Sequence, residues 1–161
     1  MGLGSGANTF AYAKNNPLRY IDRKGLETTV IITFDYGLGS HAALYVQTPG
    51  QPNYLYDPAG SYDPGGRRGS GGVFEGDDAN LQSYIDYQES TGSTVETVTL
   101  PTTPEQENQL KNNADEIGDP RGFSCANAVS STFDDICGIA HTSLPGTLYE
   151  EALKAICQPK K

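Results

Sequence analysis

Three side chains in this sequence could together carry out nucleophilic catalysis: the thiol of Cys125, the imidazole of His41 and the carboxylate of Asp57. A thiol nucleophile needs a base to take its proton, and an imidazole base needs a carboxylate or amide to hold its tautomer and orientation. The three residues lie far apart in the sequence. Such chemistry therefore depends on the elements that bring them together.

The stretch around Cys125, GFSCANAV, predicts a loop that turns into a helix with the cysteine at the first helical position. Ser124 is a suitable N-cap, and apolar residues then recur at helical spacing: Ala126, Val129, Phe133 and Ile136. The unpaired amides and the dipole at a helix start favour the thiolate, and the amide of Cys125 could contribute to an oxyanion site. The alternative is a small buried hydrophobic residue, as most free cysteines are.

His41 opens the run HAALYV, which predicts a strand with alternating faces. Asp57 follows the next predicted strand, YLY at 54–56, and a hairpin between the two strands would bring it beside His41. Both residues have competitors. Asp63 repeats the Asp-Pro dipeptide of Asp57, a favoured turn initiator, and His141 is an alternative base that no predicted strand holds.

The remaining pattern predicts an α+β domain. Residues 28–34 form a nearly continuous apolar run typical of a central strand, and residues 94–100 alternate like a half-buried strand. Besides the Cys125 helix, three helices are predicted: from Asp77 or Asp78 to Tyr87, from the N-cap Thr103 to Gly118, and from Pro145 with Thr147 and Glu150 in capping-box positions. Residues 58–72, rich in Gly, Pro and Ser, predict a flexible flap and not a phosphate-binding loop.

Composition narrows the function classes. The chain of 161 residues has a formal net charge of −9, which argues against nucleic acid as a partner. No apolar run suggests membrane insertion, and no signal-peptide pattern is evident at the start.

Three cysteines exclude a full disulfide framework. Cys137 and Cys157 could pair, but we expect them to be reduced and buried. The histidines and cysteines also lack the spacing of a metal site, and we expect neither a metal nor a cofactor.

The first residues differ in character from the rest. Residues 8–26, NTFAYAKNNPLRYIDRKGL, resemble the end of the core of Rhs-repeat polymorphic toxins, where a tyrosine-rich repeat runs into Asn-Asn-Pro and closes with Asp-x-x-Gly-Leu. Asp22, Gly25 and Leu26 match the closing motif, whereas Arg23 stands where the family usually has Pro, which leaves cleavage after Leu26 open. The resemblance implies that residues 1–26 are the tail of the core shell and residues 27–161 the toxin domain.

A second resemblance covers roughly residues 38–150. SHAALYV, YLYDPAGSY, a Thr-Pro-Glu helix start and GFSCANAV are together similar to the circularly permuted papain-like cysteine hydrolases, which include NlpC-type wall peptidases. The resemblance implies a small antiparallel sheet packed against helices, with the nucleophile at a helix N-terminus. It also implies that Cys125 is the nucleophile, His41 the general base and acid, and Asp57 the residue that orients the imidazole.

These expectations combine into an antibacterial effector, delivered by a contact-dependent secretion system and neutralised by a cognate immunity protein. We expect a cysteine protease that acts on a protein in the cytoplasm of the recipient bacterium. The acidic composition, the lack of a wall-binding module and the lack of a clear disulfide plan support this choice. The same triad would serve a periplasmic peptidoglycan amidase or endopeptidase, or a protein deamidase or transglutaminase. A non-catalytic binding toxin is the alternative outside enzymes.

Overall fold

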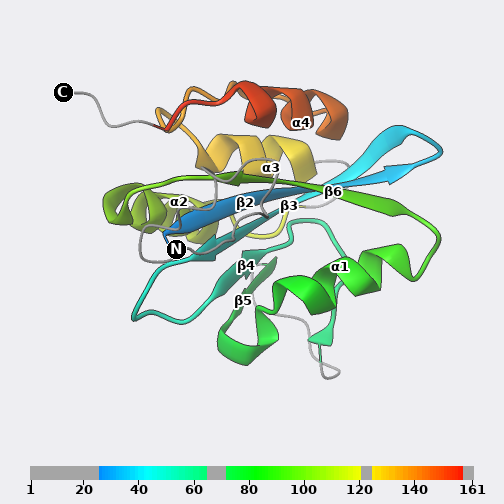
Figure 1. The fold of residues 1–161 in the computed structure, drawn as a ribbon, viewed down its shortest axis with the longest axis horizontal. Coiled ribbons are helices and arrows are strands. Elements are labelled where there is room, and N and C mark those ends of the chain that lie inside the picture. The colour runs from blue at the N-terminus through cyan, green and yellow to red at the C-terminus, as the bar shows by residue number, and fades with distance from the viewer. Residues whose placement is uncertain (1–25, 65–71, 121–124, 158–161) are drawn as a thin grey trace, which may run out of the picture.

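The computed structural model describes residues 26–64, 72–120 and 125–157, which form an antiparallel sheet flanked by helices on both faces (Figure 1). The sheet has the strand order β5-β4-β3-β2-β6, and every neighbouring pair is antiparallel. Its strands are β2 (Glu27–Asp35), β3 (Leu38–Gln47), β4 (Tyr54–Tyr56), β5 (Val73–Glu75) and β6 (Thr94–Leu100). The helices are α1 (Leu81–Glu89), α2 (Pro104–Ile117), α3 (Cys125–Thr132) and α4 (Pro145–Lys154), with a short 3-10 turn, η4 (Gly76–Asp78), before α1. The prediction of an α+β domain is confirmed.

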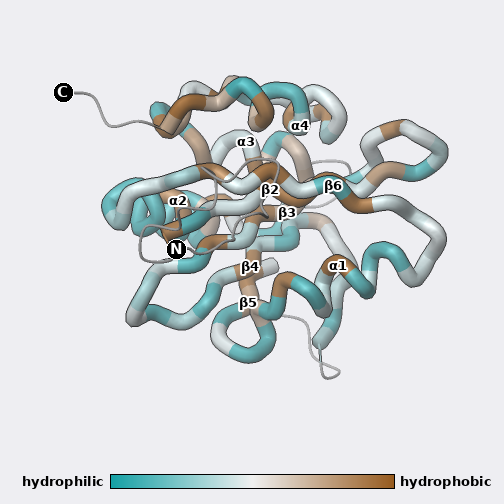
Figure 2. Tube along the Cα trace, viewed as in Figure 1, coloured by the Kyte–Doolittle hydropathy of each residue, from teal (hydrophilic) through white to brown (hydrophobic). Residues whose placement is uncertain are grey.

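The sheet separates two hydrophobic clusters. One face is covered by α2, α3 and α4 and the other by α1 (Figure 1). On β3, Ala42, Leu44 and Val46 belong to the first cluster, whereas Ala43 and Tyr45 belong to the second. Hydrophobic segments accordingly gather along β2 and β3 in the middle of the molecule (Figure 2). Both faces of the central strands are covered, which explains why their sequences are nearly continuously apolar.

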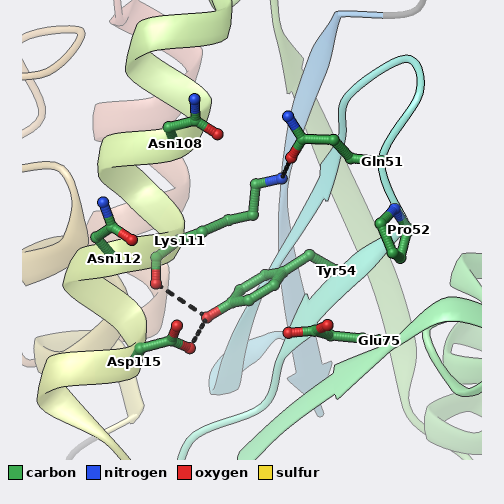
Figure 3. Close-up of a pocket in the computed structure, with 8 residues that line it drawn as sticks. All are labelled: Gln51, Pro52, Tyr54, Glu75, Asn108, Lys111, Asn112 and Asp115. Atoms are coloured by element: carbon green, nitrogen blue, oxygen red, sulfur yellow. Dashed lines mark hydrogen bonds between the residues drawn. The ribbon is translucent and has the colours of Figure 1, made fainter.

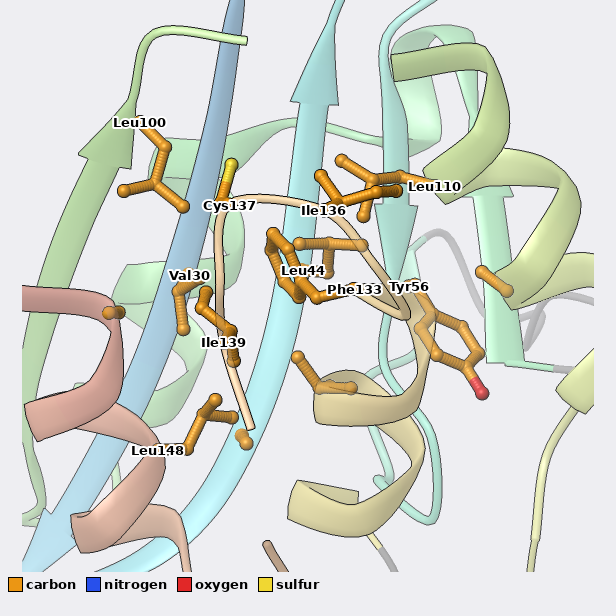
Figure 4. Packing of buried hydrophobic residues seen from close by; sticks show 14 of the residues in the cluster. Val30, Leu44, Tyr56, Leu100, Leu110, Phe133, Ile136, Cys137, Ile139 and Leu148 are labelled. Carbon is orange, nitrogen blue, oxygen red and sulfur yellow. The ribbon is translucent and has the colours of Figure 1, made fainter. Parts of the chain in front are cut away.

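The larger cluster sits between the sheet and the three helices on its face. Figure 4 shows Leu44 of β3 and Val30 of β2 under Phe133, Ile136 and Ile139 from the segment after α3. Ala126 and Val129 of α3 are fully buried in the same cluster. This packing holds the N-terminal end of α3 against β3, and contacts between α3 and β3 are extensive.

Helix starts follow the sequence signals in part. Thr103 caps α2 with a complete capping box to Gln106, as predicted. The predicted start of α1 at Asp77 or Asp78 is wrong, because these residues form η4 and the side chain of Asn80 caps the helix instead. The predicted capping box of α4 is also wrong, because Leu144 occupies the N-cap without a side-chain hydrogen bond.

The segment after α3 corrects two further expectations. Helix α3 ends at Thr132, so Phe133 and Ile136 are buried outside the helix and not on its continuing face. Cys137 and Cys157 form a disulfide, so the expectation that they are reduced is wrong. The chain leaving α4 returns beside the turn after α3, where the amide of Ile156 donates to the carbonyl of Cys137. This tertiary contact has no local sequence signature.

Several predictions lie outside the described residues. These are residues 1–25 of the predicted core tail, the loop before Cys125 with the predicted N-cap Ser124, and residues 65–71 of the predicted flap. Among the residues that are described, no helix is both long enough and apolar enough to cross a bilayer.

Candidate active site

The sheet brings His41 and Asp57 into direct contact. His41 lies on β3, and Asp57 directly follows β4, whose last residue pairs with Leu44 of β3. The imidazole Nε2 lies 2.6 Å from Asp57 Oδ1. The carboxylate side chain is fully buried, whereas the imidazole is 16% exposed. The histidine therefore faces solvent on one side and a fixed carboxylate on the other.

The third predicted residue completes the arrangement. Cys125 is the first residue of α3, is buried, and is the free cysteine of the chain. Interactions with the His41 imidazole and with the backbone amides of Ala42 and Ala126 lower the pKa of its thiol. Because Nε2 is engaged by Asp57, Nδ1 is the ring nitrogen left for the thiol. The structure thus brings the three residues together: His41 is hydrogen-bonded to Asp57, and its imidazole and the Cys125 thiol shift each other's pKa.

The electrostatics of the pair favour charge separation. Burial lowers the pKa of His41, but the hydrogen bonds and charges of Asp57 and Cys125 outweigh it and raise that pKa to about 9. Burial raises the pKa of the Cys125 thiol, but the bond to His41 and the nearby amides bring that pKa below its ordinary value. Opposite charges in contact stabilise each other's ionised form. Both shifts favour the ionised pair, a thiolate beside an imidazolium, which is a nucleophile next to an acid.

The competing residues do not join this cluster. Asp63 is exposed, whereas Asp57 is the carboxylate that bonds to His41. His141 is exposed in the segment between α3 and α4, and the imidazole that lowers the pKa of the Cys125 thiol is that of His41. Within the described parts of the chain, no group of three or more His, Cys, Asp or Glu side chains is arranged to hold a metal ion.

Sequence reasoning missed the residues that enclose Asp57. The hydroxyl of Tyr84 donates to Asp57 Oδ1 at 2.8 Å, and the amide of Tyr62 donates to Oδ2 at 3.3 Å. A Cβ at Gly60 would collide with the carboxylate, so only glycine fits there. The burial of Tyr84 follows from the helical periodicity of α1, but nothing in the sequence indicates that its hydroxyl reaches Asp57.

Comparisons with known proteins find no match. No protein-family model, no curated protein and no solved structure is significantly similar to this chain. Function is therefore inferred from the geometry of the Cys125 site and from the sequence resemblances.

A polar pocket of about 370 Å³ lies between α2 and the β4–β5 side of the sheet, and none of the three predicted site residues lines it (Figure 3). Its main polar groups are paired with one another. Lys111 Nζ donates to Gln51 Oε1, and the Tyr54 hydroxyl donates to Asp115 and to the carbonyl of Lys111. These bonds join α2 to the start of β4, so they account for the lining residues as structural contacts.

Proposed function

We propose that this protein is a cysteine hydrolase in which Cys125 is the nucleophile, His41 the general acid and base, and Asp57 the orienting carboxylate. The observation that carries the proposal is the imidazole of His41, hydrogen-bonded to a fully buried carboxylate and close enough to the thiol at the start of α3 to lower its pKa. A structural role alone does not require a free cysteine, a histidine and a buried acid from three separate elements to meet.

The proposed reaction follows from the protonation state of the pair. The Cys125 thiolate attacks the carbonyl carbon of an amide, and the backbone amide at the start of α3 is placed to stabilise the oxyanion. The His41 imidazolium gives its proton to the leaving nitrogen, the carbon–nitrogen bond breaks, and an acyl-enzyme remains. The now neutral imidazole then takes a proton from water, whose oxygen attacks the thioester; the carbon–sulfur bond breaks, which releases the acid and restores the thiolate–imidazolium pair.

We assign the fold to the circularly permuted papain-like class. Two features support this assignment: the histidine strand precedes the cysteine helix in the chain, and the residue that contacts the imidazole follows the next strand. The antiparallel sheet packed on the cysteine helix agrees with the same assignment.

In its biological setting, the domain acts as an antibacterial effector carried behind an Rhs core. The resemblance of residues 8–26 to the end of such a core supports this proposal, as it supports contact-dependent delivery and a cognate immunity protein. The favoured substrate is a protein of the recipient cell, and the acidic chain, with its net charge of −9, suits a basic protein partner.

One observation favours a second candidate, a peptidoglycan amidase or endopeptidase of the periplasm. Disulfides persist in oxidising compartments and are rare in reducing cytosol. The Cys137–Cys157 bond therefore removes one of the reasons for preferring a cytoplasmic substrate. The same three residues would cleave an amide of the wall peptide by the same steps.

Two substrate assays with Cys125→Ala as the control separate these proposals. A protease produces new protein N-termini when the wild type is incubated with a recipient lysate, and none with the variant. An amidase instead clears purified sacculi in a zymogram. His141→Ala serves as a matched control for His41→Ala, because His141 is exposed outside the cluster. Toxicity that survives Cys125→Ala in a folded protein would show a non-catalytic binding toxin and overturn both.

A further inference from the structure

Helix α1 contributes a hydrogen-bonded chain that ends on the same carboxylate oxygen as His41. Asp57 Oδ1 accepts from His41 Nε2 at 2.6 Å and from the Tyr84 hydroxyl at 2.8 Å. The Tyr84 hydroxyl in turn accepts from Gln88 Nε2 at 2.9 Å. Tyr84 and Gln88 are one turn apart on α1 and thus lie on the same face of the helix.

The direction of these bonds is fixed by chemistry. The tyrosine hydroxyl has one hydrogen, and the side-chain amide of Gln88 donates to its oxygen. The hydroxyl hydrogen is therefore free to point at Asp57, which as a carboxylate can only accept. A buried carboxylate needs donors to keep its charge, and a second donor also limits its rotation.

Aromatic packing holds Tyr84 in this position. Tyr62 makes edge-on contacts with the rings of Tyr84, Phe74 and Tyr87, with centroid distances of 5.0, 5.4 and 5.3 Å. The amide of Tyr62 also donates to the second oxygen of Asp57. The ring of Tyr84 is fully buried, so its hydroxyl has little freedom to turn away from the carboxylate.

We propose that Tyr84, oriented by Gln88, is a positioning residue that holds Asp57 so that the His41 imidazole stays aligned with the Cys125 thiol. This inference rests on the proposed function. It makes α1, on the opposite face of the sheet from the nucleophile, part of the machinery that sets the reactivity of Cys125.

Two substitutions test the role of the hydroxyl without removing the ring. Tyr84→Phe deletes the donor and keeps the aromatic contacts. Gln88→Glu keeps the hydroxyl but replaces the donor by an acceptor, which draws the Tyr84 hydrogen away from Asp57. The matched control is Tyr87→Phe on the same helix, because the Tyr87 hydroxyl bonds to Ser61 and not to Asp57.

The readout is the rate of Cys125 alkylation by iodoacetamide from pH 5 to 10, followed by mass spectrometry. Cys125 is the free thiol, since the other two cysteines of the chain are bonded to each other. The titratable groups that face the cluster are His41 on β3, Cys125 on α3, Tyr62 after β4, Tyr84 on α1 and Asp78 on η4. Thermal unfolding of each variant checks that the fold is retained.

We expect Tyr84→Phe and Gln88→Glu each to slow alkylation at pH 6 about tenfold. This factor corresponds to a rise of one unit in the pKa of the Cys125 thiol. Tyr87→Phe should follow the wild-type profile. A wild-type profile for Tyr84→Phe, or an equal loss in Tyr87→Phe, would overturn the role of Tyr84 and leave the hydrolase proposal standing. A wild-type thiol with no enhanced reactivity below its ordinary pKa would overturn both proposals.

Discussion

The charge of Asp57 keeps His41 protonated in a largely buried position. Burial alone lowers the pKa of His41, yet the contacts with Asp57 and Cys125 raise it to about 9. Asp57→Asn keeps the size of the side chain and removes the charge, so we expect the pKa of His41 to fall to its ordinary value or below. An NMR titration can follow this directly, because the chain has only two histidines.

The same substitution should change reactivity and stability in a defined pH window. Reactivity requires the thiolate and the imidazolium together, so its alkaline limb should lie near pH 9 in the wild type and at lower pH in Asp57→Asn. We expect a loss of at least about 100-fold in turnover at pH 7. The raised pKa means that the imidazolium stabilises the fold fully below pH 6.5, and that this contribution disappears as pH rises to about 9. A stability difference between the two proteins that grows toward pH 9 would contradict this account.

Gly60 leaves the space that the buried carboxylate of Asp57 occupies. A methyl group at this position would meet the side chain of Asp57 and push it from His41. We expect Gly60→Ala to lower activity at least about tenfold, since misplacing a catalytic group by a fraction of an ångström weakens its alignment. Gly146→Ala is the control, because a Cβ there meets nothing within 4 Å and α4 gains helix propensity. Equal activity in both variants would show that Asp57 tolerates displacement.

At the scale of elements, the sequence predicts those features that local chemistry determines. Strands β2 and β3 and the start of α2 follow from apolar runs and from the capping box at Thr103. The sequence does not predict β5, because three residues flanked by glycines carry too little pattern to indicate a strand.

The candidate site also has a part that the sequence predicts and a part that it does not. The meeting of Cys125, His41 and Asp57 is predictable, because each residue lies in or next to an element with a recognisable pattern, although β3 begins three residues before His41. The hydrogen bond from Tyr84 and the space left by Gly60 depend on how α1 and the loop after β4 pack against the sheet. No local signal carries that information, and the return of Cys157 to Cys137 is missed for the same reason.

The capping box of α2 provides a stability test at this scale. The Thr103 hydroxyl accepts from the amide of Gln106, and the Gln106 side chain accepts from the amide of Thr103. We expect Thr103→Ala to lower the free energy of unfolding by about 1 kcal/mol, the typical value for losing an N-cap. Urea denaturation measures it. Cys125 alkylation should be unchanged, because α2 contributes no residue to the triad; a parallel loss of reactivity would show that α2 positions the site.

At the scale of the whole molecule, the candidate site draws on both faces of the sheet. The nucleophile comes from α3 on one face, the groups that hold Asp57 come from α1 on the other, and His41 lies on the strand between them (Figure 1). The site therefore exists only when both hydrophobic clusters are formed. The enhanced reactivity of the Cys125 thiol below its ordinary pKa should consequently be lost when the whole protein unfolds.

The disulfide makes the persistence of that fold depend on redox conditions. Cys137 and Cys157 are 20 residues apart and close a loop that contains α4, and both are buried in the larger cluster (Figure 4 shows Cys137). We expect the double substitution of both cysteines by serine to lower the free energy of unfolding by about 3 kcal/mol, the loop-closure value for a loop of this size. Guanidinium denaturation with and without dithiothreitol measures it.

The reductant should move the unfolding midpoint of the wild type to that of the variant and leave the variant unchanged. Below the transition, alkylation of Cys125 should match the wild type, because Cys137 lies beyond the opposite end of α3. If the reductant does not shift the wild type, α4 is held by its packing alone, and the periplasmic candidate loses its support.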